Sequence, residues 1–332
     1  GDDVAAIEQF RRVIEKAPES SVADRAYYEL AWSLKRQEKP ADARAAYQQL
    51  LERYSDSRYA DAATIELAEL EFEAEAYDAA IGRLEPLLAR TDRPEIRRRA
   101  LYRLGWCFFE KEQYAEAARH FAQIVEQYPD SEFAAPAGYQ AGEAWFRRKE
   151  YNSAVVQYQQ VVERFPEFKL YPEALLRVAE CRALLEQWAP SQKAAEQFIE
   201  RFTNHERIGR AWFQLGWALE NQARFDTALQ AYRNSLDKEA QGETAARAQF
   251  QIGECLFAQN EFAAAVKELL KVDILYSYPE WTARALLEAG HALEKMDRLS
   301  EARARYREIR ERYPRTEEAR AAALRLRTIG ER

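Results

Sequence analysis

Apolar residues recur along this chain at the spacing of amphipathic helices, and the clearest stretch runs from position 101 to 129. Its apolar positions are Leu101, Leu104, Gly105, Phe108, Tyr114, Ala117, Phe121 and Ile124. Such spacing gathers apolar side chains on one face of a helix, so the stretch predicts two amphipathic helices. The polar residues 110–113 between them predict a tight turn, and Pro129 ends the second helix.

The same pattern returns every 37 residues without an insertion. A small residue marks the first helix, helix A, in Ala31, Ala68, Gly105, Gly142, Ala179, Gly216, Gly253 and Gly290. Alanine or serine marks the second helix, helix B, in Ala6, Ala43, Ala80, Ala117, Ala154, Ser191, Ala228, Ala265 and Ala302. Because several positions keep this register over eight periods, the sequence predicts an all-α fold, an α-solenoid of stacked antiparallel helix pairs.

These positions resemble the tetratricopeptide repeat (TPR), in which a small residue in helix A precedes aromatic, alanine, aromatic and proline positions in helix B. One unit matches at Gly105, Tyr114, Ala117, Phe121 and Pro129, and the next at Gly142, Tyr151, Ala154, Tyr158 and Pro166. The resemblance covers essentially the whole chain and implies a TPR superhelix. It implies little about activity, because function in such folds lies in sites added to them.

The period of 37 residues exceeds the 34 of the common repeat. The surplus falls between the closing proline and helix A, where we expect an extra N-terminal turn on helix A. This long variant resembles the repeats of bacterial cell-envelope proteins of the outer-membrane assembly lipoprotein and Tol-Pal coordinator types. That resemblance implies a bacterial periplasmic or cell-envelope location, with the cytoplasm as the alternative.

The register divides the chain into three parts that form one continuous solenoid. Residues 1–20 are an orphan helix B, residues 21–315 are eight repeats of 37-residue period, and residues 316–332 are a capping helix. A terminal helix with a polar outer face is typical of such caps. Because the chain starts inside a helix B, we interpret it as a fragment of a longer protein.

Charge is interspersed along the chain rather than gathered in one region. There are 49 Lys and Arg against 56 Asp and Glu, for a net charge of −7. Nucleic acid is not an expected partner, because it would need a basic face. No apolar run approaches the roughly 18 residues of a membrane span, so no direct span is expected in this fragment.

The residues that usually carry chemistry are few and scattered. His120 is expected on the outer side of a helix B, His205 in a turn and His291 on a helix A, each without a partner in a neighbouring repeat. The cysteines are Cys107, Cys181 and Cys255, two repeats apart and thus roughly 20 Å or more from one another. A disulfide needs a much shorter separation, so we expect buried free thiols. The sequence predicts no enzyme, no cofactor and no metal site.

Helix A carries a second row of aromatic residues, one position along from its packing row. The row consists of Tyr28, Trp32, Tyr102, Trp106, Phe109, Tyr139, Phe146, Phe213, Trp217, Phe250 and Phe257. Beside it run arginines at Arg25, Arg99, Arg210, Arg247 and Arg284, and glutamates at Glu69, Glu143, Glu180 and Glu254. In the TPR family, which the chain resembles, this side of helix A lines the concave groove that binds peptides. Aromatic anchors within a polar surround are typical of recognition surfaces.

Two interpretations of this row remain open. In the first, it lines a groove that holds a partner. In the second, neighbouring A helices pack along it, the rings are buried, and Arg and Glu pair across repeats. We hypothesise a non-catalytic scaffold that binds a peptide or protein segment in its concave groove, in a bacterial envelope assembly. The alternative ligand is an envelope glycan, because tryptophan and tyrosine faces stack on sugar rings.

Overall fold

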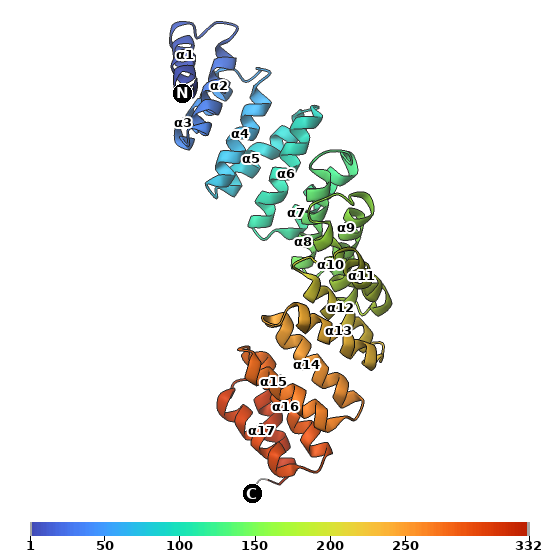
Figure 1. Ribbon diagram of the computed structural model, residues 1–332. Coiled ribbons are helices and arrows are strands. Elements are labelled where there is room, and N and C mark those ends of the chain that lie inside the picture. Colours follow the sequence, from blue (N-terminus) through green and yellow to red (C-terminus); the bar gives the residue numbers. More distant parts are fainter. Residues whose placement is uncertain (1, 331–332) are drawn as a thin grey trace. The chain divides into compact units, whose positions relative to one another are not determined.

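The computed structural model describes residues 2–330, with side chains from residue 4, and within that range every regular element is an α-helix (Figure 1). The predicted all-α class is confirmed. The helices gather into two compact units, Gly1–Phe168 with α1–α9 and Lys169–Arg332 with α10–α18. Each unit is described below by itself.

The helices of the first unit are α1 (Asp2–Lys16), α2 (Ala23–Arg36), α3 (Pro40–Arg53), α4 (Ala60–Glu73), α5 (Tyr77–Arg90), α6 (Pro94–Glu110), α7 (Tyr114–Gln127), α8 (Ala134–Arg147) and α9 (Tyr151–Arg164). Those of the second unit are α10 (Tyr171–Leu184), α11 (Trp188–Arg201), α12 (Ile208–Glu220), α13 (Phe225–Lys238), α14 (Glu243–Ala258), α15 (Phe262–Leu275), α16 (Pro279–Lys295), α17 (Leu299–Arg312) and α18 (Glu317–Thr328). The even-numbered helices are the A helices and the odd-numbered ones the B helices.

In five of the repeats, an aromatic or aliphatic side chain of helix B lies over a glycine of helix A. On α7, Phe121 is fully buried over Gly105 of α6, where a Cβ atom would come within 2.5 Å of the ring. Burying such a ring contributes about 2–3 kcal/mol. The crossing therefore needs glycine at that position, because close packing leaves the ring no room to move.

The turn between helices A and B has the same backbone in every repeat. One residue with left-handed backbone closes helix A at Glu38, Glu75, Glu112, Lys149, Glu186, Ala223, Asn260 and Asp297. In the first repeat, the amide of Glu38 donates to the carbonyl of Lys35 and that of Lys39 to the carbonyl of Leu34, which satisfies carbonyls at the helix end. The eight residues are spaced by 37, so the sequence period is also the period of the turn.

The prediction of an extra N-terminal turn on helix A is correct for some repeats and wrong for others. α6, α14 and α16 are 16 or 17 residues long and begin early, as predicted. α8 begins only at Ala134, because residues 128–133 form two successive turns in which the amides of Ser131 and Ala134 donate to the carbonyls of Tyr128 and Ser131. In such repeats the surplus residues satisfy their backbone groups in turns instead of a helix.

Successive A helices also contact one another. In the first unit α4 contacts α6, and in the second α10 contacts α12, α12 contacts α14, α14 contacts α16 and α16 contacts α18. The A helices thus form a layer in each unit. We term the side of this layer that carries Tyr28, Trp32 and the residues at multiples of 37 from them the A face.

The three cysteines are buried thiols outside any disulfide, which confirms the sequence prediction. Burial raises the pKa of Cys107 to about 12, so its thiol stays protonated near neutral pH. None of the described helices combines the length and the apolar composition that a membrane span requires. Among the described residues, no group of three or more His, Cys, Asp and Glu could hold a metal ion.

The expected positions of His205 in a turn and of His291 on a helix A are correct, whereas the outward position of His120 and the isolation of His205 are wrong. His120 does not face outward: it is 7% exposed and stacks on Phe108, because its position on α7 lies over α6. Burial lowers its pKa to about 4, so the imidazole is neutral near neutral pH. His205 and His291 do have carboxylate neighbours, since His205 Nε2 lies 3.7 Å from a carboxylate oxygen of Glu173 and His291 Nδ1 lies 3.1 Å from Glu288.

Candidate partner-binding face

In the first unit the predicted aromatic row is partly accessible. Trp32 is 41% exposed, and the other six rings of the row in this unit are half-buried. These half-buried residues are Tyr28, Tyr102, Trp106, Phe109, Tyr139 and Phe146. The Tyr28 ring stacks on Tyr59 at 5.4 Å between centroids, and the Trp106 ring meets Phe109 edge-on at 5.6 Å. Each of these half-buried rings therefore packs against its neighbours on one side and stays accessible to solvent on the other.

In the second unit the row divides. Trp217 and Phe257 are half-buried, whereas Phe213 is 2% exposed and Phe250 is 8% exposed. The assignment of Phe213 and Phe250 to an accessible row is therefore wrong. The guanidinium of Arg247 lies 4.6 Å above the Phe213 ring, and the Trp281 ring packs 5.8 Å from Phe250, so both rings are covered from the next helix.

The arginines beside the row are engaged within the protein. Arg99 Nη2 donates to Glu66 Oε1 at 2.6 Å, and Arg210 Nη2 lies 2.9 Å from Glu180 Oε2. Arg25 is exposed, and its Nε lies 3.5 Å from Oε1 of Glu29. The guanidinium of Arg247 lies over the Phe213 ring. For Arg99 and Arg210, the pairing of charges across repeats that the packing interpretation expected is what the structure shows.

At one contact between A helices of the first unit, every carboxylate is paired with an arginine of the next A helix. This contact, the α4/α6 seam, consists of Glu66, Glu69 and Phe72 on α4 and of Arg99 and Arg103 on α6. Arg103 Nη2 donates to Glu69 Oε2 at 3.1 Å, and its Cζ lies 4.4 Å from the centre of the Phe72 ring. Glu66 also accepts from Lys35 Nζ at 3.0 Å. Burial raises the pKa of Glu66, but Arg99 and Lys35 outweigh it and leave the pKa lowered.

The corresponding contact in the second unit lacks these charges. This α14/α16 seam lies 185 residues further along, five periods of 37. It consists of Gln251, Glu254, Phe257, Arg284 and Glu288, which occupy the positions of Glu66, Glu69, Phe72, Arg99 and Arg103. The place of Arg103 is thus taken by a carboxylate. Arg284 pairs with Glu280 at 2.8 Å and with Glu318 at 3.5 Å, and its guanidinium lies over the Trp281 ring.

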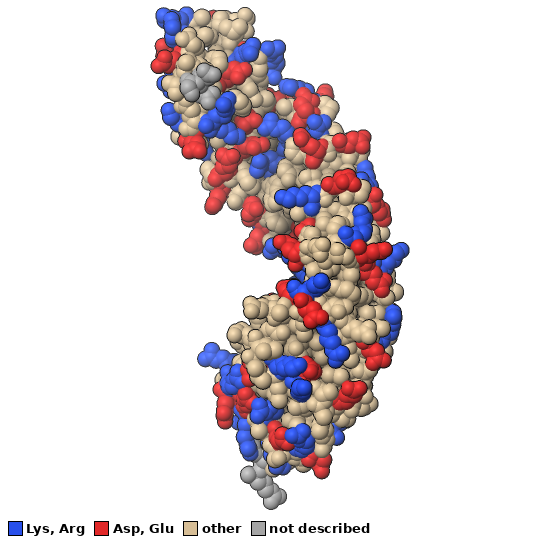
Figure 2. All heavy atoms as spheres, viewed as in Figure 1, with Lys and Arg blue, Asp and Glu red and all other residues tan. Residues whose placement is uncertain are grey.

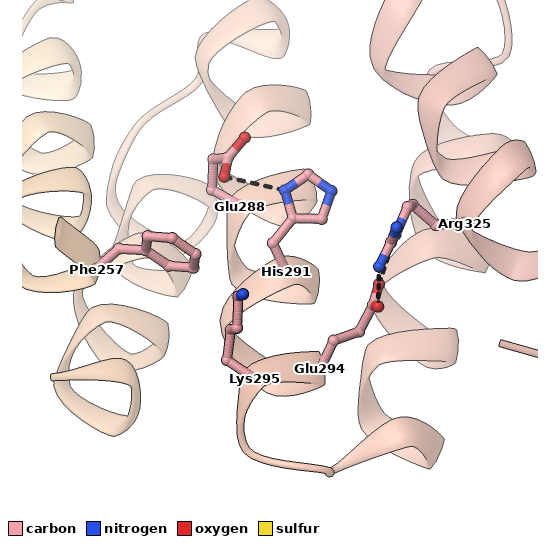
Figure 3. A pocket seen from close by; sticks show the side chains of 6 residues that line it. All are labelled: Phe257, Glu288, His291, Glu294, Lys295 and Arg325. Carbon is pink, nitrogen blue, oxygen red and sulfur yellow. Dashed lines mark hydrogen bonds and ion pairs between the residues drawn. The ribbon is translucent and has the colours of Figure 1, made fainter. Parts of the chain in front are cut away.

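A pocket of about 550 Å³ opens at the α14/α16 seam. It is lined by Phe257, Glu288, His291, Glu294, Lys295 and Arg325. Phe257 projects from α14 toward the side chains of α16, and Arg325 reaches back from α18 to Glu294 (Figure 3). Lys295 is exposed and forms no ion pair with any described residue.

The second unit also keeps two half-buried carboxylates, Glu254 and Glu220, without nearby cations. Burial, together with the charges of Glu288 and Glu220, raises the pKa of Glu254 to about 8. Glu254 Oε1 is buried and accepts no hydrogen bond within the described part of the chain. The pKa of Glu220 is also raised, by burial, although Glu220 accepts hydrogen bonds from Tyr232 at 2.5 Å and Gln251 at 2.8 Å.

Away from these seams the surface charges are mixed. On the face that Figure 2 shows, basic and acidic side chains alternate over both units without a large area of one sign. The A face therefore differs from the rest of the surface in its aromatic row and its seams, not in its net charge. The sequence analysis missed the open α14/α16 seam, although a comparison of positions 72 and 103 with positions 257 and 288 would have found it.

Comparisons with known proteins agree with this architecture. A family model described as a tetratricopeptide repeat-like domain matches residues 4–167, and tetratricopeptide repeat models match residues 185–243, 213–277 and 284–316. These matches together span most of both units. The chain belongs to the tetratricopeptide repeat proteins.

Solved structures share the fold at low sequence identity. The C-terminal part of a TPR repeat-containing protein from Cytophaga hutchinsonii is 16% identical with a TM-score of 0.57, over 74% of this chain and 94% of that one. The APC/C hetero-tetramer Cut9–Hcn1 contains a chain 15% identical with a TM-score of 0.51, over 97% of this chain and 59% of that one. At such identities the likeness shows the fold alone. No curated protein matches this sequence.

Proposed function

We propose that this chain is a non-catalytic scaffold that binds a segment of another protein along its A face. TPR proteins generally mediate protein–protein interaction. The observation that carries the proposal for this chain is the partly open aromatic row of the first unit, where Trp32 is 41% exposed. Half-packed aromatic rings lose little conformational freedom on binding and offer large apolar surfaces.

The row keeps its open edge although the rings have partners of their own. The Trp106 ring is held edge-on by Tyr102 at 6.3 Å and by Phe109 at 5.6 Å between centroids. Arg36 lies 4.8 Å from the Trp32 ring and adds a positive rim. A partner segment would thus meet rings that are already oriented, which reduces the entropic cost of binding.

The wider setting is also a proposal. We place the scaffold in a bacterial envelope assembly, in the periplasm or at the cell envelope, on the resemblance of its long repeats to those of envelope proteins. Support for this setting would come from a partner that is itself an envelope protein. The partner's identity therefore tests the location and the function together.

The test compares capture of partners from a bacterial envelope extract by the wild-type chain and by a Trp32→Ala, Trp106→Ala variant. The captured protein is identified, purified and titrated against both chains. Truncating two central rings is expected to weaken binding by roughly 30-fold or more. Val156→Ala is the matched control, because Val156 is a 52% exposed apolar residue on a B helix.

Three results would contradict the proposal. A double variant with unchanged circular dichroism that still binds at full affinity would move the site away from the row. A double variant that unfolds would show that the row belongs to the core. Quenching of tryptophan fluorescence by envelope polysaccharide fragments, without capture of a protein, would assign the A face to a glycan ligand.

A further inference from the structure

At several seams between A helices, the last apolar or charged side chain of one A helix meets an equivalent residue of the next, and a cation takes part in the contact. Lys35 meets Glu66, the Phe72 ring carries Arg103, and Glu294 is paired with Arg325. These contacts occupy equivalent positions in the 37-residue period.

The α14/α16 seam differs from these three contacts. Phe257 corresponds to Phe72 and Glu288 to Arg103, so a carboxylate stands where the ring would otherwise receive a guanidinium. Within the described residues, the Phe257 ring contacts Phe262 at 5.3 Å, and no cation lies over it. Glu254 corresponds to Glu69, which has Arg103 at 3.1 Å and Arg99 at 3.5 Å. Glu254 forms neither contact, because Glu288 stands at the position of Arg103 and Arg284 pairs elsewhere.

We propose that the pocket at the α14/α16 seam binds an arginine side chain of the partner, with its guanidinium over the Phe257 ring and directed toward the carboxylate of Glu288. The bound group would take the place that Arg103 has in the first unit. The proposal rests on the proposed function, because it names the chemistry of the partner that one part of the A face accepts.

Three features select a guanidinium over other ligands. A flat cation can lie on an aromatic ring and donate to carboxylates at the same time, which an ammonium does less well. A metal ion is disfavoured, because the described residues contain no group of three or more ligands of the required kinds. An anion would meet the carboxylates of Glu288 and Glu294, which line the pocket.

The volume of the pocket fits this occupant, and the carboxylates of the pocket already engage two of its three basic side chains. About 550 Å³ lies within the range of pockets that hold small ligands, so one long side chain can enter with its neighbours. Arg325 is already engaged by Glu294, and His291 by Glu288 (Figure 3). Lys295 at the rim is the pocket's own exposed cation and would compete weakly with the incoming group.

The direct test uses the full chain with its phenylalanine rings isotopically labelled. The probe is the blocked peptide acetyl-Gly-Arg-Gly-amide, and the control is the same peptide with uncharged citrulline in place of arginine. The arginine peptide is expected to shift the Phe257 ring resonances and to bind about tenfold more tightly than the citrulline peptide. The Phe72 resonances, whose ring already carries Arg103, are expected to stay unchanged.

Variants of the pocket sharpen the test. Glu288→Gln keeps the shape of the side chain and is expected to weaken the arginine peptide about tenfold. Glu288→Arg places an arginine at the position that Arg103 has in the first unit. Its guanidinium is expected to occupy the site over the Phe257 ring and so to abolish binding of the arginine peptide. Lys295→Met removes the competing cation and is expected to leave binding equal or tighter.

Several outcomes would overturn the inference. Equal binding of the citrulline peptide, no shift of Phe257, or loss of binding in Lys295→Met would each do so, the last by marking the pocket as an anion site. The proposed function is tested separately, at Trp32 and Trp106 in the first unit. A partner that still requires those two rings, with no arginine effect at Phe257, would leave the scaffold proposal intact and reject this one.

Discussion

The α4/α6 seam and the α14/α16 seam are built on the same backbone pattern but differ in how their charges are balanced. In the first unit, two arginines of α6 neutralise Glu69, and one of them covers the Phe72 ring. In the second unit, Glu254 and Glu288 lie close together, and the Phe257 ring faces a pocket. One substitution in register, Arg103 to Glu288, accounts for much of this difference.

The comparison shows that a repeat fold tolerates an unmatched seam when other contacts secure the helices. The α14 and α16 helices remain packed through buried small and apolar residues such as Ala285, Ala289 and Phe250. A seam that is not needed for folding is free to serve binding. A partly satisfied polar contact costs stability, so its presence points to a ligand that completes it.

The largest expected effect is a difference in pH dependence between the two seams. Glu254 has a pKa of about 8 in the folded chain against an ordinary value of 4.5. Because the folded state holds this proton more tightly, the stabilisation is complete below pH 4.5 and is lost as the pH rises through 8. Between about pH 6 and pH 9 the second unit should lose about 3 kcal/mol.

Glu66 should act in the opposite direction, because its pKa is lowered in the folded chain. Its stabilisation is present above the unfolded value and is lost as the pH falls through the folded value. Amide-exchange protection factors measured as a function of pH would separate the effect of Glu254, seen in α14 and α16, from that of Glu66, seen in α4 and α6. Glu254→Gln should remove the alkaline loss in the second unit, and an equal loss in that variant would contradict the assignment.

A second prediction concerns a variant in which the α4/α6 seam receives the carboxylate that the α14/α16 seam has at the equivalent position. Arg103→Glu should destabilise the first unit by about 2 kcal/mol, because it places a carboxylate beside Glu69 and removes the cation over Phe72. Protection factors of α4 and α6 would measure the loss. The variant should also let the arginine peptide shift the Phe72 resonances.

The control for this change is Arg119→Glu, since Arg119 is an exposed residue of α7 in the same unit. It alters the net charge equally and should change stability by less than about 0.5 kcal/mol. If both variants destabilise α4 and α6 to the same extent, the effect belongs to net charge and the comparison of the seams loses its basis.

Much of the fold was predictable because it depends on residues within one repeat. The spacing of apolar residues determined the helices, and the small residues at positions such as Gly105 indicated where helix B crosses helix A. The accessibility of the aromatic row was less predictable, because it depends on the next repeat. Tyr28 is half-buried beneath Tyr59, whereas Phe250 is buried because the larger Trp281 stands at the equivalent place.

The same reasoning explains why the open seam escaped the sequence analysis. A column of glutamates such as Glu69 and Glu254 looks uniform until the partner of each is known. That partner lies on a neighbouring helix, at a position with its own variation. Pairs of positions across neighbouring repeats carry this information, and single columns do not.

The smallest expected effect on stability concerns the turns that follow α4 and α14, each of which contains one residue with left-handed backbone. Glu75 adopts φ 58° after α4, and Asn260 adopts φ 63° after α14. Asparagine tolerates this backbone better than glutamate, because its short side chain bonds locally. Glu75→Asn should therefore stabilise the first unit by about 0.5 kcal/mol, and Asn260→Glu should destabilise the second by a similar amount. Urea unfolding followed by exchange protection in each unit would measure both changes, and two shifts of the same sign would show that side-chain contacts, not backbone strain, govern these turns.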